Sequence, residues 1–212
     1  MSSVTPLAGR LRVSIAAGSR AGFFGKLPAR GDFVRDGLPG SFVGPWDDWL
    51  RLALAGSRDH LGKDWLAAWM EAPVWRFALA AGLCGDAAAI GVMLPSVDRA
   101  GRYFPLTFAV LLTPDMQALT AELSFESGEV ADWMDGGEAV GRAALEQGLG
   151  PDRVAALLPT PPRAAATPAA GSRWWTSGAP RVAAGSRRFA ALPDALGFAS
   201  MLTDAQPAEP PA

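Results

Sequence analysis

The 212-residue sequence predicts a single α+β domain: a mainly antiparallel β-sheet with helices packed on both faces. One observation is that three short apolar runs, at 74–83, 88–95 and 102–112, are joined by connections too short for a crossover helix. Consecutive strands of this kind must pair antiparallel. The other observation is that these runs are apolar throughout, whereas a sheet with one face in water would alternate. Helices are therefore expected to cover both faces of the sheet.

The first element of the domain is predicted to be a strand from Ala21 to Leu27, which stops at Pro28. Residues 1–20, which precede it, are expected to form a flexible extension. The segment that follows, ARGDFVRDGLPG, carries enough Gly, Pro and Asp to predict a long loop.

Two amphipathic helices are predicted after this loop. The first begins at Ser41, and its apolar face consists of residues at helical spacing: Phe42, Trp46, Trp49, Leu50, Ala53 and Leu54. Asp47 and Arg51 are placed to pair across one turn on another face. The second helix runs from Leu61 to Met70, with an apolar stripe of Leu61, Trp65, Leu66, Trp69 and Met70. Tryptophans at this spacing are typical of a core rather than of a binding platform.

The second half of the chain predicts helices first and strands later. Residues 114–158 have helical signals that are interrupted at Gly136-Gly137 and at residues 148–150. The stretch 159–173, PTPPRAAATPAAGSR, has no periodicity and predicts a linker or a long surface loop.

The C-terminal part of the domain predicts two more strands, near residues 173–177 and 187–191. In the first of these, adjacent Trp174 and Trp175 must point to opposite faces of the sheet. A last helix spans Pro193 to Leu202, with the proline in its first turn. The domain is expected to span 21–203 and to be followed by a disordered tail over 204–212.

Composition argues against several function classes. The net charge is −2 and the pI is about 5.4, unlike the basic surface of a nucleic-acid binder. No segment predicts an export signal or a membrane span, and Cys84, the single cysteine, lies in an apolar run. We therefore expect a protein of the reducing cytoplasm that neither binds nucleic acid nor inserts into a membrane.

The inventory of catalytic residues is poor. His60 is the single histidine and lies between two predicted helices, where a helix C-terminal cap or a solvated loop residue is expected. Zinc sites and histidine-dependent nucleophiles would all depend on this residue. We expect no enzyme, no catalytic residue, no metal and no cofactor.

Two short motifs near the N-terminus do not carry function. Gly25-Lys26 is not a phosphate loop, because Ala21 stands where the upstream glycine is required and Leu27 stands where a metal-binding Ser or Thr is required. The triplet RGD at 30–32 is a chance match.

A cluster of charged residues next to apolar strands is the strongest candidate site. Its members are Arg30, Asp32, Arg76, Asp98, Arg99 and Arg102. Because an unpaired buried charge costs several kcal/mol, Arg76 is expected to pair with Asp32 or Asp98. The cluster is either a structural ion-pair network or a polar concavity that binds a ligand or a segment of a partner; catalysis is a third alternative.

Several long motifs resemble the TagF (ImpM) family of type VI secretion-associated proteins. They read GFFGKLPARGDFVRDGLPGSFVGPWDDWL, APVWRFALAAGLCG and GVMLPSVDRAGRYFPLT, followed by RWWTSGAPRV and FAALPDALGFASML. The residues that carry the resemblance are Gly22, Phe24, Gly25, Lys26, Pro28, Gly31, Asp32, Phe33, Trp46, Trp75, Arg76, Pro95, Ser96, Asp98, Gly101, Arg102, Phe104, Pro105, Trp174 and Trp175.

The resemblance implies a cytoplasmic accessory protein that represses the type VI secretion system after translation. The partner that it implies is the forkhead-associated (Fha) scaffold protein, bound by sequestration without chemistry. An alternative from another class is a small-molecule or anion-binding sensor or enzyme that uses the Arg/Asp cluster. A third is purely architectural: the sheet with its flanking helices serves as an assembly platform, or it dimerises through exposed aromatics such as Trp174 and Trp175.

Overall fold

The computed structural model describes residues 21–112, 128–163, 165 and 167–205. In this part of the chain seven strands form one sheet in the order β2-β1-β5-β4-β3-β6-β7, and each neighbouring pair is antiparallel. The strands are β1 (Gly22–Gly25), β2 (Val34–Asp36), β3 (Trp75–Leu79), β4 (Ala88–Leu94), β5 (Leu106–Leu112), β6 (Ser172–Thr176) and β7 (Gly185–Phe189). The predicted antiparallel sheet and the α+β class are confirmed.

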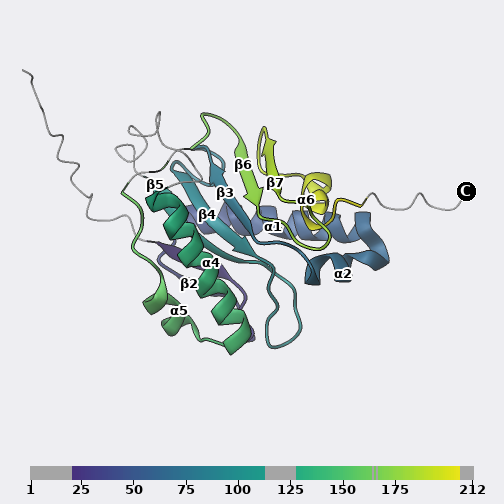
Figure 1. Ribbon diagram of the computed structural model, residues 1–212, viewed down its shortest axis with the longest axis horizontal. Helices are drawn as coiled ribbons and strands as arrows, with labels where there is room; N and C mark the ends of the chain where they lie inside the picture. Colours follow the sequence, from purple (N-terminus) through teal and green to yellow (C-terminus); the bar gives the residue numbers. More distant parts are fainter. Residues whose placement is uncertain (1–20, 113–127, 164, 166, 206–212) are drawn as a thin grey trace, which may run out of the picture.

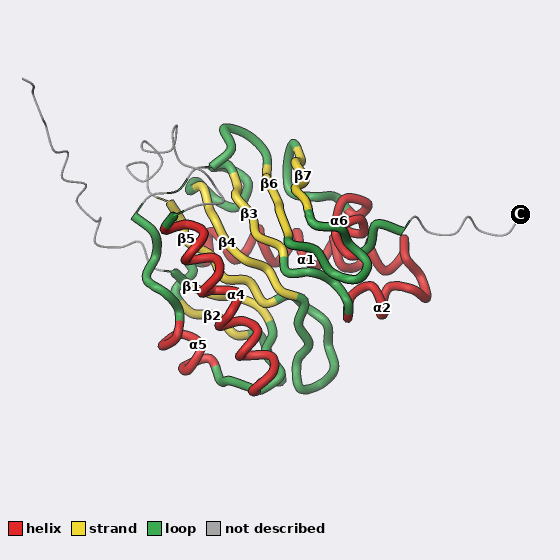
Figure 2. Tube along the Cα trace, in the orientation of Figure 1, coloured by secondary structure: helices red, strands yellow, loops and turns green. Residues whose placement is uncertain are grey.

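Helices cover both faces of the sheet, as Figures 1 and 2 show. Three of them lie on one face: α1 (Gly40–Leu61), α2 (Trp65–Met70) and α6 (Ala195–Leu202). A short 3₁₀ helix, η1 (Gly62–Asp64), joins α1 to α2. The other face carries α4 (Glu129–Gln147) and α5 (Pro151–Leu157). None of the helices in the described ranges is both long enough and apolar enough to cross a membrane.

The core on the α1 side is rich in aromatic residues. Trp46 is fully buried against Phe77 of β3 and Trp174 of β6, with ring centroids 4.9 and 6.1 Å away. The predicted Asp47–Arg51 pair forms at 2.6 Å. In α2 the buried side is made by Trp65, Ala68 and Trp69.

The stripe predicted for the second helix was wrong in part. Leu66 and Met70 are exposed, because α2 is only six residues long and its buried positions follow Trp65 at spacings of three and four. The helix also begins later than predicted, since α1 continues to Leu61.

The core on the α4 side depends on close approach of the helix to the sheet. Val92, Leu94 and Phe108 form this surface of β4 and β5, and α4 packs on it through Gly137 and Gly141. A Cβ at Gly141 would lie 2.8 Å from the Leu94 side chain. The helix runs unbroken through Gly136-Gly137, contrary to the prediction. The packing of α4 on the sheet offsets the low helix propensity of the two glycines. The predicted break at 148–150 is correct, and Gly148 closes α4 in the left-handed conformation.

Trp174 and Trp175 lie in the two opposite cores, as their alternation predicted. Both are buried, so the prediction that these two aromatics are exposed is wrong.

Other differences concern the ends of elements. The strand predicted from residue 74 ends at Leu79, where a turn follows, and the one predicted from 102 begins at Leu106, because Tyr103 pairs with Val97 inside the connection. The predicted loop after Pro28 contains the three-residue strand β2. The stretch 159–173 is free of helix and strand in its described residues up to Gly171 and then enters β6. The extension over 1–20, residues 114–127 of the helical prediction and 206–212 of the tail lie outside the described residues.

Candidate functional site

The candidate site is built from two segments that connect neighbouring strands and contact each other. The β1–β2 connection covers residues 26–33, and the β4–β5 connection covers residues 95–105. The backbone N–H of Arg99 donates to the carbonyl oxygen of Arg30 at 3.0 Å, and the Arg102 guanidinium donates to the carbonyl oxygen of Gly31. A bridge between Val97 and Tyr103 closes the β4–β5 connection into a hairpin. The two segments are thus tied together at several points.

Asp98 is the centre of this arrangement, and its carboxylate is completely buried. One oxygen, Oδ2, accepts from Lys26 Nζ at 2.6 Å and from Arg102 Nε at 2.7 Å. The other, Oδ1, accepts the backbone N–H groups of Ala100 and Arg102, both at 2.9 Å. We call Lys26, Asp98 and Arg102 the ionic node. Burial by itself would raise the pKa of Asp98, but these four donors outweigh it and hold that pKa well below its usual range.

Lys26 is almost as buried as its partner, with 5% of its side chain exposed. Its ammonium lies 4.3 Å from the centre of the Phe33 ring, which is stacked on Phe24 and meets Phe104 edge to face. The carbonyl oxygen of Lys26 accepts from Ser96 Oγ at 2.7 Å. A cation in such surroundings is stabilised by the carboxylate and by the aromatic face together.

The backbone conformation before Lys26 accounts for the glycine at position 25. Its φ of +144° is outside the range that other residues adopt readily, and a Cβ at this position would clash with the carbonyl oxygen of Pro105. The Gly25-Lys26 step is therefore a close approach of two backbones followed by a structural cation. It does not form a phosphate loop.

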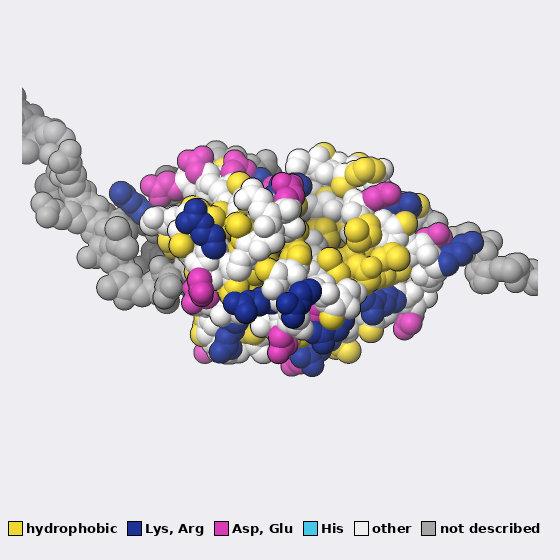
Figure 3. All heavy atoms as spheres, turned by 90° about the horizontal axis from the view of Figure 1, so that it is seen from below, with side chains coloured by type: hydrophobic (Ala, Val, Ile, Leu, Met, Phe, Trp, Pro, Cys, Tyr) yellow, Lys and Arg dark blue, Asp and Glu magenta, His cyan; other side chains and the backbone are white. Residues whose placement is uncertain are grey.

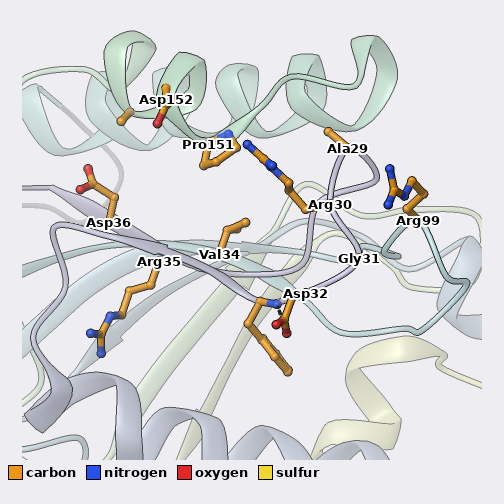
Figure 4. Close-up of a pocket in the computed structure, with 12 residues that line it drawn as sticks. Ala29, Arg30, Gly31, Asp32, Val34, Arg35, Asp36, Arg99, Pro151 and Asp152 are labelled. Atoms are coloured by element: carbon orange, nitrogen blue, oxygen red, sulfur yellow. Dashed lines mark hydrogen bonds between the residues drawn. The ribbon is translucent and has the colours of Figure 1, made fainter.

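An open groove of about 860 Å³ lies beside the ionic node, between the β1–β2 connection and α5 (Figure 4). The charged residues that line it are Arg30, Asp32, Arg35, Asp36, Arg99 and Asp152. Figure 4 shows the Arg30 side chain reaching toward Pro151 and Asp152 of α5, while Asp36 lies at the far end and Arg99 at the near end. In Figure 3, which views the molecule from below, several basic side chains gather near the middle of the surface, with acidic side chains beside them.

The predicted cluster is only partly assembled. Arg30, Asp32, Asp98, Arg99 and Arg102 lie on the two joined connections. Asp32 accepts the N–H of the next residue, Phe33, at 2.8 Å and takes no part in the ionic node.

Arg76 is not part of the cluster, and its predicted pairing with Asp32 or Asp98 is wrong. The guanidinium of Arg76 on β3 lies 2.5 Å from Asp135 and 3.1 Å from Glu138, both on α4. The side chain points to the sheet face that α4 covers, so the nearest carboxylates come from that helix. Three strands separate β3 from β2 in the sheet.

Sequence reasoning missed several residues of the groove and the role of one lysine. Arg35, Asp36, Pro151 and Asp152 were not proposed, because they come together only through the packing of α5 on β2. Lys26 entered only as part of a motif. Its position directly after an apolar strand could have revealed its role. A lysine at such a position needs a carboxylate partner, as Arg76 does within its strand.

The described residues contain no group of three or more His, Cys, Asp or Glu side chains that could hold a metal ion. His60 is exposed in the last turn of α1, within the helix rather than between two helices as predicted. Cys84 is buried, and burial raises the pKa of its thiol to about 12.

Two comparisons with known proteins found a match. Residues 22–160 match the family described as the TagF N-terminal domain, type VI secretion system-associated. The crystal structure of PA0076 from Pseudomonas aeruginosa PAO1 is similar to this fold with a TM-score of 0.76 and 38% sequence identity, over 91% of this chain and 98% of that chain. No curated protein matches the sequence. The family match covers most of the chain and includes the ionic node and the groove, so the chain belongs to the TagF family of type VI secretion-associated proteins.

Proposed function

We propose that this protein is a cytoplasmic repressor of the type VI secretion system that acts after translation by binding the forkhead-associated scaffold protein. The binding sequesters the scaffold and involves no chemistry. Family membership supports the link to the secretion system. The form of the site supports binding over catalysis.

The observation that carries the proposal is the saturation of Asp98. Both carboxylate oxygens already accept two hydrogen bonds each, and the low pKa keeps the group ionised and paired. A general base needs a free lone pair directed at a substrate, which this carboxylate does not offer. The ionic node instead fixes two surface connections in one conformation. A surface that is ordered before binding loses less entropy when a partner docks.

The alternative, an anion pocket built from the whole Arg/Asp cluster, fits the geometry less well. It requires Arg76 and Arg102 to converge on one ligand, but Arg76 lies against α4, and Arg102 is bonded to Asp98 and Gly31. A thermal shift screen against nucleotides and phosphorylated metabolites tests this alternative. A ligand at 100 times its Kd would stabilise the fold by about 2.7 kcal/mol.

Co-purification tests the proposed function. The purified protein and the Fha-type scaffold from the same gene cluster, both unphosphorylated, are mixed at physiological salt and separated by size. A complex that survives the separation is the expected result. Two folded proteins that elute independently would contradict the proposal. An unrelated forkhead-associated domain serves as the control for binding to the fold in general.

A further inference from the structure

We propose that Arg30 and Arg99 form a two-arginine site that binds a short acidic segment of the partner protein, with a separate carboxylate on each guanidinium. This inference rests on the proposed function, because it names the chemistry by which the partner is held.

The two arginines are neighbours without being adjacent in sequence. The N–H of Arg99 donates to the carbonyl oxygen of Arg30 at 3.0 Å, so the two residues sit side by side on separate connections. Both side chains are exposed and both line the groove. Neither guanidinium forms an ion pair with any residue in the described ranges.

The buried charges of the site are already paired with one another. Lys26 and Arg102 share the carboxylate of Asp98, so the only fully buried acid of the site is consumed within the ionic node. Arg30 and Arg99 therefore add two positive charges to a surface on which the nearest buried carboxylate is already neutralised.

Guanidinium groups suit carboxylates because their N–H donors form a planar fork that matches the two oxygens. The backbones that carry Arg30 and Arg99 are held by the ionic node, so only the side chains need to be ordered on binding. The groove of about 860 Å³ is large enough for a peptide segment rather than for one side chain alone.

The opposite end of the groove limits the length of the acidic run. Asp36 lines that end, and Asp152 at the start of α5 lies between it and the Arg30 side chain (Figure 4). This end of the groove offers carboxylates as well as Arg35, so a purely acidic segment fits it less well than it fits Arg30 and Arg99. The segment that fits is acidic where it meets Arg30 and Arg99 and is neutral or basic beyond them.

The test compares two double variants of the full-length protein. Arg30→Ala/Arg99→Ala removes the proposed site and leaves the backbone bond between the two residues in place. Arg51→Ala/Arg188→Ala removes the same total charge from exposed positions on α1 and on β7, at the opposite edge of the sheet from β2. Binding is measured by calorimetry against the purified scaffold, and by fluorescence anisotropy against a labelled six-residue peptide with three glutamates.

The first variant is expected to bind the scaffold about 10–100-fold more weakly than wild type and to lose binding of the acidic peptide, since interface arginines are frequent hot spots. The control variant is expected to stay within about threefold of wild type, as exposed charges away from an interface contribute little. Melting temperatures within about 2 °C of wild type for both variants would show that the fold is intact.

The possible failures are distinguishable. If wild type binds the scaffold and Arg30→Ala/Arg99→Ala binds it equally well, the inference is overturned and the proposed function stands. If wild type ignores the scaffold but binds the acidic peptide through the two arginines, the inference stands and the partner is a different protein. Equal weakening of both double variants would overturn the inference, because the loss of binding would then depend on the net charge of the protein and not on the positions of the arginines.

Discussion

Replacement of Asp98 by alanine tests whether the ionic node holds the two connections together. The Asp98 carboxylate is fully buried, and its partner Lys26 has 5% of its side chain exposed. Truncation leaves the ammonium of Lys26 in the interior without its counter-ion. Arg102 is less affected, since 58% of its side chain already lies in water.

The magnitude follows from the burial of the two partners. Breaking a buried ion pair by removing one member costs about 3–5 kcal/mol, because the remaining charge is desolvated and unpaired. In a chain of this size each kcal/mol lowers Tm by about 2–4 °C, so a decrease of roughly 6–20 °C is expected. The loss is a large part of the 5–15 kcal/mol that is typical of a folded domain.

The assay is thermal unfolding followed by circular dichroism, together with urea denaturation of the same samples. Asp32→Ala is the matched control, since Asp32 is an exposed aspartate of the same site whose carboxylate accepts the N–H of its neighbour Phe33. Its free energy of unfolding should change by less than about 0.5 kcal/mol. The double variant Lys26→Met/Asp98→Leu should recover much of the stability lost in Asp98→Ala, because it leaves no buried charge. A decrease in Tm of less than about 2 °C for Asp98→Ala would refute the reasoning.

Three further predictions concern acid, a thiol and a glycine. Because the folded pKa of Asp98 is lowered, the unfolded chain binds more protons than the folded chain below about pH 5. The free energy of unfolding should therefore decrease as the pH is lowered through the unfolded pKa near 3.9, with a slope up to about 1.4 kcal/mol per pH unit steeper than in Asp98→Asn. Parallel curves for the two proteins would contradict this. Cys84, with its pKa raised to about 12, should resist a thiol reagent at pH 8 in the native state and react on denaturation; rapid native-state reaction would show that the thiol is accessible. Gly25→Ala should cost about 2–5 kcal/mol in urea denaturation, because it combines an unfavourable φ with a clash against the backbone, while Gly31→Ala, with open space around it, should be close to neutral; equal stabilities would count against the close approach.

The features of the fold that were predictable are those that repeat along the sequence. The helical spacing of Phe42, Trp46 and Leu50 and the continuous apolar runs of β3, β4 and β5 each contain several residues that signal the same element. Strand β2 was not predictable, since it has three residues, of which Val34 alone is buried, and residues typical of turns surround it. The strand conformation of these residues depends on their pairing with β1 and not on the local sequence.

The site was predictable only as a set of charges that need partners. The need for a carboxylate near Arg76 was inferred correctly, but the choice among acids depends on which helix covers that face of β3. That choice is a long-range property, as the 59 positions between Arg76 and Asp135 show. The Lys26–Asp98 contact spans 72 positions and is equally invisible to local patterns. The groove arises where α5 packs on β2, so its walls could not be assigned before the fold was known.

The most direct test of the account is secretion by cells that lack this protein and are complemented at matched protein levels. The measurement is the amount of a type VI effector in the medium, with immunoblots showing that the components of the apparatus are unchanged. Wild type and the Arg51→Ala/Arg188→Ala control are predicted to repress secretion equally, while Arg30→Ala/Arg99→Ala represses it several-fold less. Full repression by Arg30→Ala/Arg99→Ala, or repression that coincides with lower levels of the apparatus, would contradict the account.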